Sequence, residues 1–136
     1  MEFETPCACA ALRRAARAYD AALAPSGLRI TQFSILRRLG PLPVTRLAAE
    51  AVLDRSTMGR NLNPLERRGL VRIKVGNADQ RERIAHLTAA GETAIAAALP
   101  HWRKAQKRTA ALVQPSVIAE LADRLDALAV REQGRM

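Results

Sequence analysis

Apolar side chains recur every three or four residues along most of this chain, which is the spacing of amphipathic helices. The spacing is found in six segments: residues 8–24, 31–39, 44–52, 54–69, 88–113 and 115–131. Between residues 70 and 88 the period changes to two, and apolar and basic side chains alternate on both sides of the turn sequence GNADQ. The pattern therefore predicts a mainly α-helical chain with one small, basic β-hairpin.

Residues 54–69 have the clearest helix boundaries. Asp54 is a good N-cap, and Gly69 is placed to end the helix as a C′ glycine. Three apolar residues spaced by four and three positions predict a buried face: Met58, Leu62 and Leu65. The other positions form a polar face that is nearly free of acidic residues: Ser56, Thr57, Arg60, Asn61, Asn63 and Arg67.

Two other helices have recognisable starts. Thr31 is the expected cap of the second helix, and Pro115 or Ser116 is expected to begin the last one.

The size and charge of the chain limit the kinds of partner. Its 136 residues suit one domain, and 22 Lys and Arg against 13 Asp and Glu give a net charge of +9. This charge indicates a polyanionic partner, with nucleic acid ahead of an anionic membrane surface. No apolar run approaches the roughly 20 residues that span a bilayer, and the start MEFETPCACA is acidic where a signal peptide is basic. We expect a cytoplasmic protein that does not enter membranes.

The order of the predicted elements is that of a winged helix-turn-helix. Two short helices and a turn precede a helix with a polar outer face, and the basic hairpin follows as the wing. A helix fits the major groove of DNA, where Arg and Asn pair with base edges, and a wing reaches phosphates or a minor groove. The expected DNA contacts are Arg55, Ser56, Thr57, Arg60, Asn61, Asn63, Arg67, Arg72, Lys74, Arg81 and Arg83. The alternative for the polar face is a solvated surface helix.

Three stretches resemble the MarR (multiple-antibiotic-resistance regulator) family of transcription factors: GLRITQFSILRRL (27–39), VTRLAAEAVLDRSTMGRNLNPLERRGLV (44–71) and DQRERIAHLTAAGE (79–92). The resemblance implies one domain over residues 1–136, with a DNA-binding lobe at about 28–90. Helices at about 6–24 and 89–131 are then expected to interlock in a homodimer on a pseudo-palindromic operator. It also implies that Arg81 reaches into the minor groove while Asp79 orients it. A surface ion pair between Arg81 and Asp79 is the alternative.

Pro64 lies inside the predicted recognition helix, where a proline removes one backbone hydrogen bond and crowds the carbonyl of Arg60. Asn63-Pro64-Leu65-Glu66 also fits a fresh helix start, with an Asn cap and proline at the first position. Family members with a similar GRNLxPLER sequence are read as having one helix here. We therefore expect a single helix with a bend near residues 60–64, and non-helical backbone at Asn63 would contradict this.

Cys7 and Cys9 are too close in sequence to join distant elements by a disulfide. The segment CAALRRAAR resembles the CFALYAASR motif of organic-hydroperoxide regulators, which makes Cys9, with Cys7, a candidate redox sensor. A helix N-terminus with Arg13 nearby would lower the pKa of such a thiol. However, Arg13 replaces the tyrosine of that motif, and inert buried thiols are the expected state. Metal binding would need further ligands, and His86 and His101 lie in separate elements, so no metal site is expected.

These observations predict a homodimeric, sequence-specific transcriptional regulator, more specifically a repressor released by a small ligand or by thiol oxidation. An architectural protein that binds DNA without sequence preference is the main alternative, and a helical interaction module is another. The sequence shows neither a glycine-rich phosphate-binding loop nor a nucleophile with a general base, so we do not expect an enzyme. We also expect no cofactor. Trp102 is expected to have a packing role, with a ligand-pocket wall as the alternative.

Overall fold

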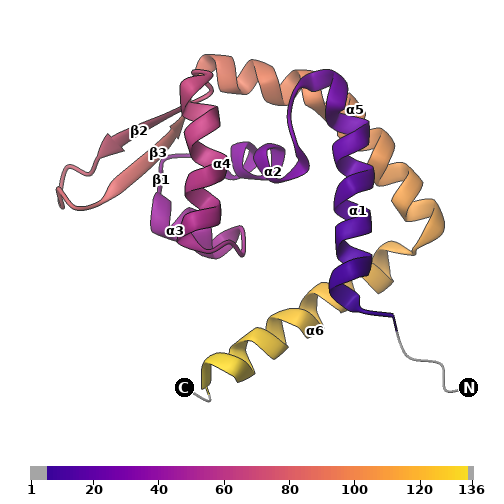
Figure 1. Ribbon diagram of the computed structural model, residues 1–136. Coiled ribbons are helices and arrows are strands. Elements are labelled where there is room, and N and C mark those ends of the chain that lie inside the picture. The colour runs from indigo at the N-terminus through magenta and orange to yellow at the C-terminus, as the bar shows by residue number, and fades with distance from the viewer. Residues whose placement is uncertain (1–5, 135–136) are drawn as a thin grey trace, which may run out of the picture. The chain divides into compact units, whose positions relative to one another are not determined.

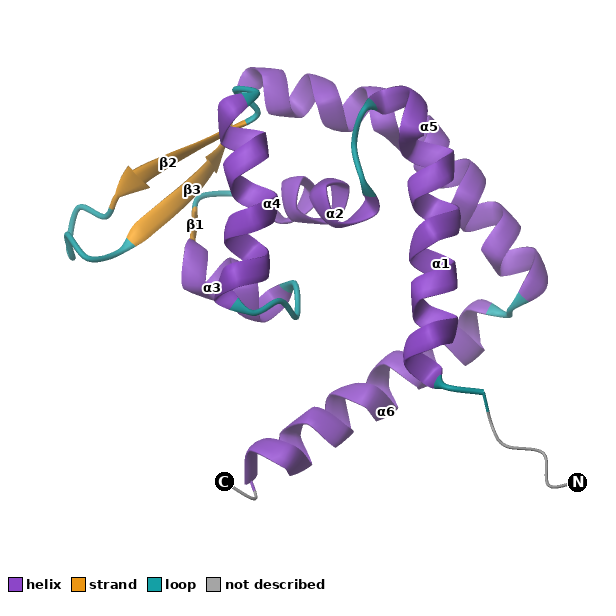
Figure 2. Ribbon diagram, in the orientation of Figure 1, coloured by secondary structure: helices purple, strands orange, loops and turns teal. Residues whose placement is uncertain are grey.

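The computed structural model describes residues 6–134 (Figure 1). It is mainly helical with a small antiparallel sheet, which confirms the predicted fold class (Figure 2). The elements are α1 (Ala8–Leu23), the 3-10 turn η1 (Ala24–Ser26), α2 (Ile30–Arg38), β1 (Leu42–Pro43), α3 (Val44–Glu50), α4 (Arg55–Arg67), β2 (Val71–Val75), β3 (Arg83–Leu87), α5 (Ala89–Leu112) and α6 (Pro115–Gly134). The chain divides into two compact units, Met1–Trp102 and Arg103–Met136.

The core of the first unit is formed by one face of each short helix and by the inner face of the sheet. Met58, Leu62 and Leu65 of α4 are buried, as their spacing predicts. Fully burying a side chain of this size contributes about 1.5–3 kcal/mol. The other buried residues of the core include Leu23, Phe33, Ile35, Leu36, Leu47, Val71, Ala85 and Ala98. The apolar periods of α2, α3 and α4 therefore identify the core correctly, whereas the apolar positions of α1 are mostly exposed and only Leu23 is buried there.

The sheet has three strands in the order β1-β3-β2, where the sequence predicted only a hairpin. β2 and β3 pair antiparallel, with Val71 opposite Leu87 and Val75 opposite Arg83. β1 adds Leu42 opposite Ala85 and Pro43 opposite Ile84. Pro43 fits an edge strand because it has no N–H to donate into a ladder. Two residues carry no detectable period, so this strand depends on contacts with β3 that are distant in sequence.

The predicted cap of α2 is wrong. The helix begins at Ile30, one residue before Thr31, and two other side chains accept hydrogen bonds from its first N–H groups. The Asp20 carboxylate of α1 accepts from the Ile30 N–H at 2.7 Å, and the Gln32 side-chain oxygen accepts from the Arg29 N–H at 3.1 Å. The start of α2 is therefore fixed by α1, from ten residues away along the chain.

The boundaries of α4 follow the sequence prediction. The Asp54 carboxylate accepts a hydrogen bond of 2.7 Å from the Thr57 N–H, as an N-cap should. Gly69 has φ +74°, and hydrogen bonds from Gly69 N to Glu66 O and from Leu70 N to Leu65 O close the helix as a Schellman motif. Pro64 lies within one uninterrupted helix, which confirms the single-helix expectation. The bend near Pro64 stays a prediction.

The second unit contains the end of α5 and all of α6. As expected, α6 begins at Pro115. Its large apolar side chains recur at helical spacing and are 36–53% exposed in this chain: Val117, Ile118, Leu121, Leu125 and Leu128. An exposed apolar stripe of this kind is typical of a surface that binds a partner. None of the described helices is long and apolar enough to cross a membrane.

Candidate nucleic-acid interface

The exposed face of α4 carries the polar residues that the sequence predicted. Ser56, Arg60, Asn63 and Arg67 are exposed, while Thr57 and Asn61 are partly buried beside them. Asn61 donates its side-chain amide to the Thr57 carbonyl at 2.9 Å, which holds that amide against its own helix. α4 therefore presents two guanidinium groups and one unengaged Asn side chain along a single helix face.

The one acidic side chain near the end of α4 is directed toward the sheet. Glu66 accepts a hydrogen bond of 3.2 Å from the Ile73 N–H of β2. β2 is an edge strand, so this carboxylate also satisfies a backbone donor that would otherwise have no strand partner. The Glu66 charge consequently lies at the junction of α4 and β2, where it links the helix to the wing.

Asp54 affects the charge at the start of α4. Its pKa is lowered by the hydrogen bond from the Thr57 backbone N–H, then by the Thr57 side chain, with a smaller contribution from Arg60. The carboxylate therefore stays ionised at neutral pH and offsets the positive end of the helix dipole. Arg55, the next residue, is exposed.

The tip of the wing is organised by Asp79. Its carboxylate accepts a hydrogen bond of 2.9 Å from the Arg81 backbone N–H, and its carbonyl accepts one of 3.1 Å from Glu82 N. Glu82 O in turn accepts from Gly76 N at 2.9 Å. In the part of the chain that the structure describes, no ion pair joins Asp79 to Arg81. Asp79 thus fixes the Arg81 backbone, while the Arg81 guanidinium is left exposed.

Three of the predicted arginines converge between the wing and the helix-turn-helix. Arg55, Arg81 and Arg83 line a hollow of about 260 Å³ together with Val44, Thr45 and Glu82. The Arg83 guanidinium also donates to the Gln80 carbonyl at 3.1 Å, which ties it to the tip. Three guanidinium groups against one carboxylate make this hollow suited to an anion such as a phosphate.

Arg72 and Lys74 lie on a different part of the wing. They alternate along β2 with Val71 and Ile73, which contact the core, so they project from the other face of the sheet. His86 lies directly opposite Arg72 on β3. Sequence reasoning did not select His86 as a site residue, because this pairing depends on the strand register, which the turn sequence alone did not fix.

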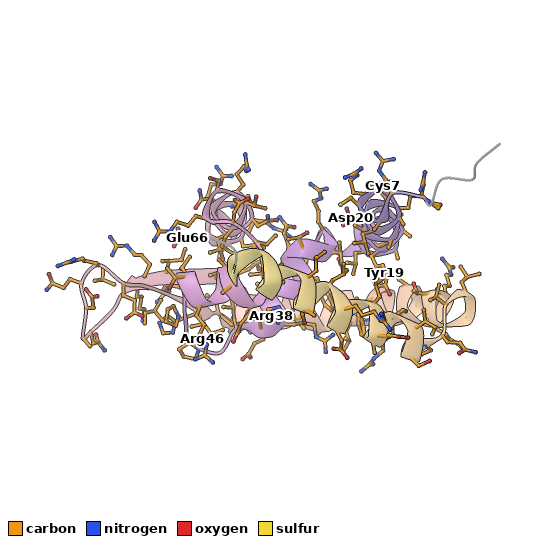
Figure 3. All side chains as sticks on the ribbon, turned by 90° about the horizontal axis from the view of Figure 1, so that it is seen from below. Cys7, Tyr19, Asp20, Arg38, Arg46 and Glu66 are labelled. Atoms are coloured by element: carbon orange, nitrogen blue, oxygen red, sulfur yellow. The ribbon has the colours of Figure 1, made fainter. Side chains whose placement is uncertain are left out.

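The two thiols are exposed, so the expectation that they are buried is wrong. Cys7 immediately precedes α1, and its pKa is lowered chiefly by the backbone N–H of Ala10, then by that of Cys9. A smaller contribution comes from the Cys9 side chain. Figure 3 labels Cys7 just before the start of α1, the helix that carries Asp20. In the described chain, no group of His, Cys, Asp and Glu side chains is arranged to hold a metal ion.

A second hollow lies between α2 and α5. It has a volume of about 290 Å³ and is lined by Phe33, Ser34, Arg37, Arg38 and Trp102. The Arg37 guanidinium carbon is 4.8 Å from the centre of the Trp102 ring and 5.5 Å from that of Phe33. Trp102 also packs against the core, which confirms its expected packing role.

Comparison with known proteins gives consistent results. The model of the MarR family matches residues 28–82. The M. tuberculosis transcriptional regulator MosR, solved in complex with DNA, is 40% identical, and the alignment covers 91% of this chain and 97% of that one with a TM-score of 0.80. The Escherichia coli transcriptional regulator HosA is 38% identical over 72 residues, which are 51% of this chain and 53% of HosA. The matched region thus spans about half the length of that curated relative.

A third relative was solved with a small molecule. CouR from Rhodococcus jostii RHA1, bound to p-coumaroyl-CoA, is 25% identical and has a TM-score of 0.72. That alignment covers 89% of this chain and 87% of CouR.

Proposed function

Because the chain belongs to the MarR family of DNA-binding transcriptional regulators, we propose that it acts in the cytoplasm as a sequence-specific regulator whose α4 enters the major groove of an operator. The exposed polar face of α4, backed by a fully buried apolar face, carries this proposal. The DNA complex of MosR, which has 40% sequence identity to this chain, supports it.

The residues of α4 divide by the DNA groups they suit. Arg60 and Arg67 have the guanidinium forks that pair with guanine or phosphate, and Asn63 can form two hydrogen bonds with adenine. Ser56 and Thr57, at the N-terminal end of α4, suit phosphate or base contacts because hydroxyl groups both donate and accept hydrogen bonds. Asn61 is expected to contribute less, because its amide already donates to Thr57.

The wing provides the second contact. Arg81 extends from a backbone that Asp79 holds in place, which limits the conformational freedom that Arg81 loses on entering a narrow minor groove. Arg55 and Arg83, which line the same hollow as Arg81, would bind the phosphates next to that groove. This division assigns sequence readout to α4 and placement on the duplex mainly to the wing.

The regulator is proposed to act as a homodimer and as a repressor. The apolar stripe of α6 supports dimerisation, because five large apolar side chains at helical spacing are otherwise left in water. In a dimer the two copies of α4 would contact successive major grooves about one helical turn apart, which implies a pseudo-palindromic operator. Residues 6–24 and 89–131 remain the segments proposed to form the dimer, in a single functional domain with the lobe at 28–90.

Release from DNA is proposed to depend on a small effector. The hollow lined by Phe33, Arg37 and Trp102 suits a flat anionic molecule, because two aromatic rings adjoin two arginines. The structure of CouR with p-coumaroyl-CoA supports an effector that joins an aromatic group to negative charge. Binding there would change the spacing of the two copies of α4 and so weaken operator affinity.

Thiol oxidation is the other proposed route of release, and Cys7 is the preferred site. A lowered pKa increases the fraction of reactive thiolate at neutral pH. Attack of this thiolate on hydrogen peroxide forms an S–O bond, breaks the O–O bond and releases hydroxide, leaving a sulfenic acid. Replacing Cys7 by Ser should abolish release by peroxide, with Cys9→Ser as the matched control. Release that is lost only in Cys9→Ser would assign the sensor to Cys9 instead.

The test of the main proposal is fluorescence anisotropy with DNA from immediately upstream of the gene, beside a scrambled duplex, across a salt series. A preference of roughly a thousandfold, falling steeply with salt, is expected for a specific regulator. Equal affinity for several upstream duplexes and the scrambled duplex would favour the architectural alternative. Light scattering of the same samples would show whether the DNA-bound form is a dimer.

A further inference from the structure

We propose that the outward face of the wing is a separate phosphate-binding surface that contacts DNA beyond the half-site read by α4. This surface consists of Arg72, Lys74 and His86. The inference rests on the proposed function, since it requires that α4 and the wing tip bind an operator. It adds a contact that is independent of base sequence and is not shared with Arg81.

The strand register brings the three side chains together. Side chains alternate between the two faces of a strand, so Arg72 and Lys74 project from one face of β2 while Val71 and Ile73 project from the other. Residues directly opposite each other on paired strands share a face, and His86 lies opposite Arg72. The outward face therefore carries two charged side chains and an imidazole within one cross-strand group.

These side chains surround a hollow rather than a flat surface. Its volume is about 310 Å³, and Leu87, Thr88 and Ala89 complete its lining. No carboxylate lines it. Three acidic residues that lie nearby along the chain have other positions: Glu66 accepts from the Ile73 backbone, Asp79 accepts from the Arg81 backbone, and Glu82 lines the hollow that contains Arg81. An anion in the outward hollow would thus meet two cations without a competing carboxylate.

DNA is the occupant favoured by position and charge. Lys74 and Arg72 lie one and three residues before Val75, the last residue of β2. At about 3.3 Å per residue they are roughly 3 and 10 Å further from the wing tip than Val75. When the tip enters a minor groove, the outward face turns toward the backbone that continues past that groove. A duplex carries about one negative charge per 1.7 Å of its axis, so any extension of the operator supplies phosphates there.

The experiment compares duplex lengths. The operator is first trimmed to the two half-sites that α4 and Arg81 are proposed to contact, and a second duplex adds about 10 bp, one turn, on each side. Affinities of the wild type and of an Arg72→Gln/Lys74→Gln double variant are measured on both duplexes across a salt series. The control variant, Arg29→Gln/Arg46→Gln, also removes two positive charges at exposed positions, which lie outside the wing and outside the segments proposed to form the dimer.

The expected result is a loss confined to the long duplex. Log affinity falls as log salt rises, and each phosphate contact adds about 0.9 to the steepness of this fall. The wing variant, which loses two contacts, should therefore show a salt dependence that is less steep by about 2 on the long duplex. Between 50 and 200 mM salt this corresponds to about a twelvefold difference in affinity. Replacing the added flanks by unrelated sequence should not change the effect, because phosphates carry no sequence information.

The other outcomes contradict the proposal in distinguishable ways. An equal loss on both duplexes would place Arg72 and Lys74 within the half-site contact, and no loss on either would remove them from the DNA interface. Binding of inorganic phosphate is measured separately on the free protein. If phosphate bound saturably to the wild type and not to the wing variant, while the DNA affinities of the two proteins did not differ with duplex length, the hollow would be assigned to a free phosphate. Failure of the wild type to prefer the trimmed operator over a scrambled duplex would instead refute the proposed function itself.

Discussion

Gly91 is the residue for which the structure makes the sharpest stability prediction. It lies in the first turn of α5, where the helix passes directly against the backbone of Leu70. A Cβ at this position would overlap the Leu70 carbonyl oxygen and the Leu87 side chain. The Leu70 carbonyl also accepts a hydrogen bond from Thr88 N at 3.2 Å, so it cannot turn away without breaking the link between α5 and the start of β2.

The size of the effect follows from two opposing contributions. In a helix interior, alanine is more favourable than glycine by about 1 kcal/mol, and this gain applies to any helical glycine. Overpacking by one carbon costs about 1–3 kcal/mol, and the upper end is appropriate where the obstacle is backbone. Gly91→Ala should therefore lower the free energy of unfolding by about 2 kcal/mol.

Gly59 provides the matched control, because it lies within α4 and a Cβ there would meet no atom within 4 Å. Gly59→Ala should raise the free energy of unfolding by up to about 1 kcal/mol. The two variants are compared by urea unfolding followed by circular dichroism at equal protein concentration, because a dimer's stability depends on concentration. If both substitutions stabilised the protein equally, the close approach of α5 to Leu70 would be refuted.

Four further predictions concern single side chains. Arg81→Ala should weaken operator binding by about 1–3 kcal/mol without changing the unfolding transition, and unchanged anisotropy would argue against minor-groove contact. Val52 is 81% exposed and has φ +57°, so Val52→Asn should raise the free energy of unfolding by about 1 kcal/mol; a lower melting temperature would show that this backbone is not strained. Asp20→Ala should cost about 1 kcal/mol of stability by uncapping α2, and Asp20→Asn should lose less; equal losses would contradict a capping role. The pKa of Asp54 is lowered in the folded protein from its ordinary value of 3.8. The ionised Asp54 carboxylate therefore stabilises the folded state fully above pH 3.8, and this stabilisation is lost as the pH falls through the lower pKa of the folded protein. Asp54→Asn should therefore be less stable than the wild type at pH 7, and the gap should close in acid.

The sequence predicts most of α4 because its boundaries depend on local chemistry. An Asp cap, a C′ glycine and apolar residues at i, i+4 and i+7 are all read without knowledge of the rest of the fold. Each is confirmed, by the Asp54–Thr57 hydrogen bond, the φ of Gly69 and the burial of Leu62. Even Pro64, which also fits a helix start, does not interrupt the helix.

The errors are at positions determined by distant parts of the chain. Thr31 has the chemistry of a cap, yet Asp20 of α1 and Gln32 satisfy the start of α2. β1 consists of two residues whose strand geometry comes from pairing with β3. The strained Val52 has no sequence signal at all, because valine is a residue that disfavours positive φ.

The candidate site shows the same division within single elements. The spacing of the apolar residues in α4 identifies the face that packs against the core. The remaining positions must face outward, so the polar face could be identified from the spacing alone. On the wing, the alternation of β2 separates Arg72 and Lys74 from the core, but only the register with β3 adds His86 beside Arg72. Similarly, Asp79 and Arg81 are neighbours in the sequence, whereas the structure shows that the carboxylate holds the backbone of Arg81 and not its guanidinium. Residue type and period therefore predict which polar side chains are exposed on the surface proposed to bind DNA. Register and backbone hydrogen bonds determine how these side chains are grouped, and this grouping is what the length-dependent binding experiment measures.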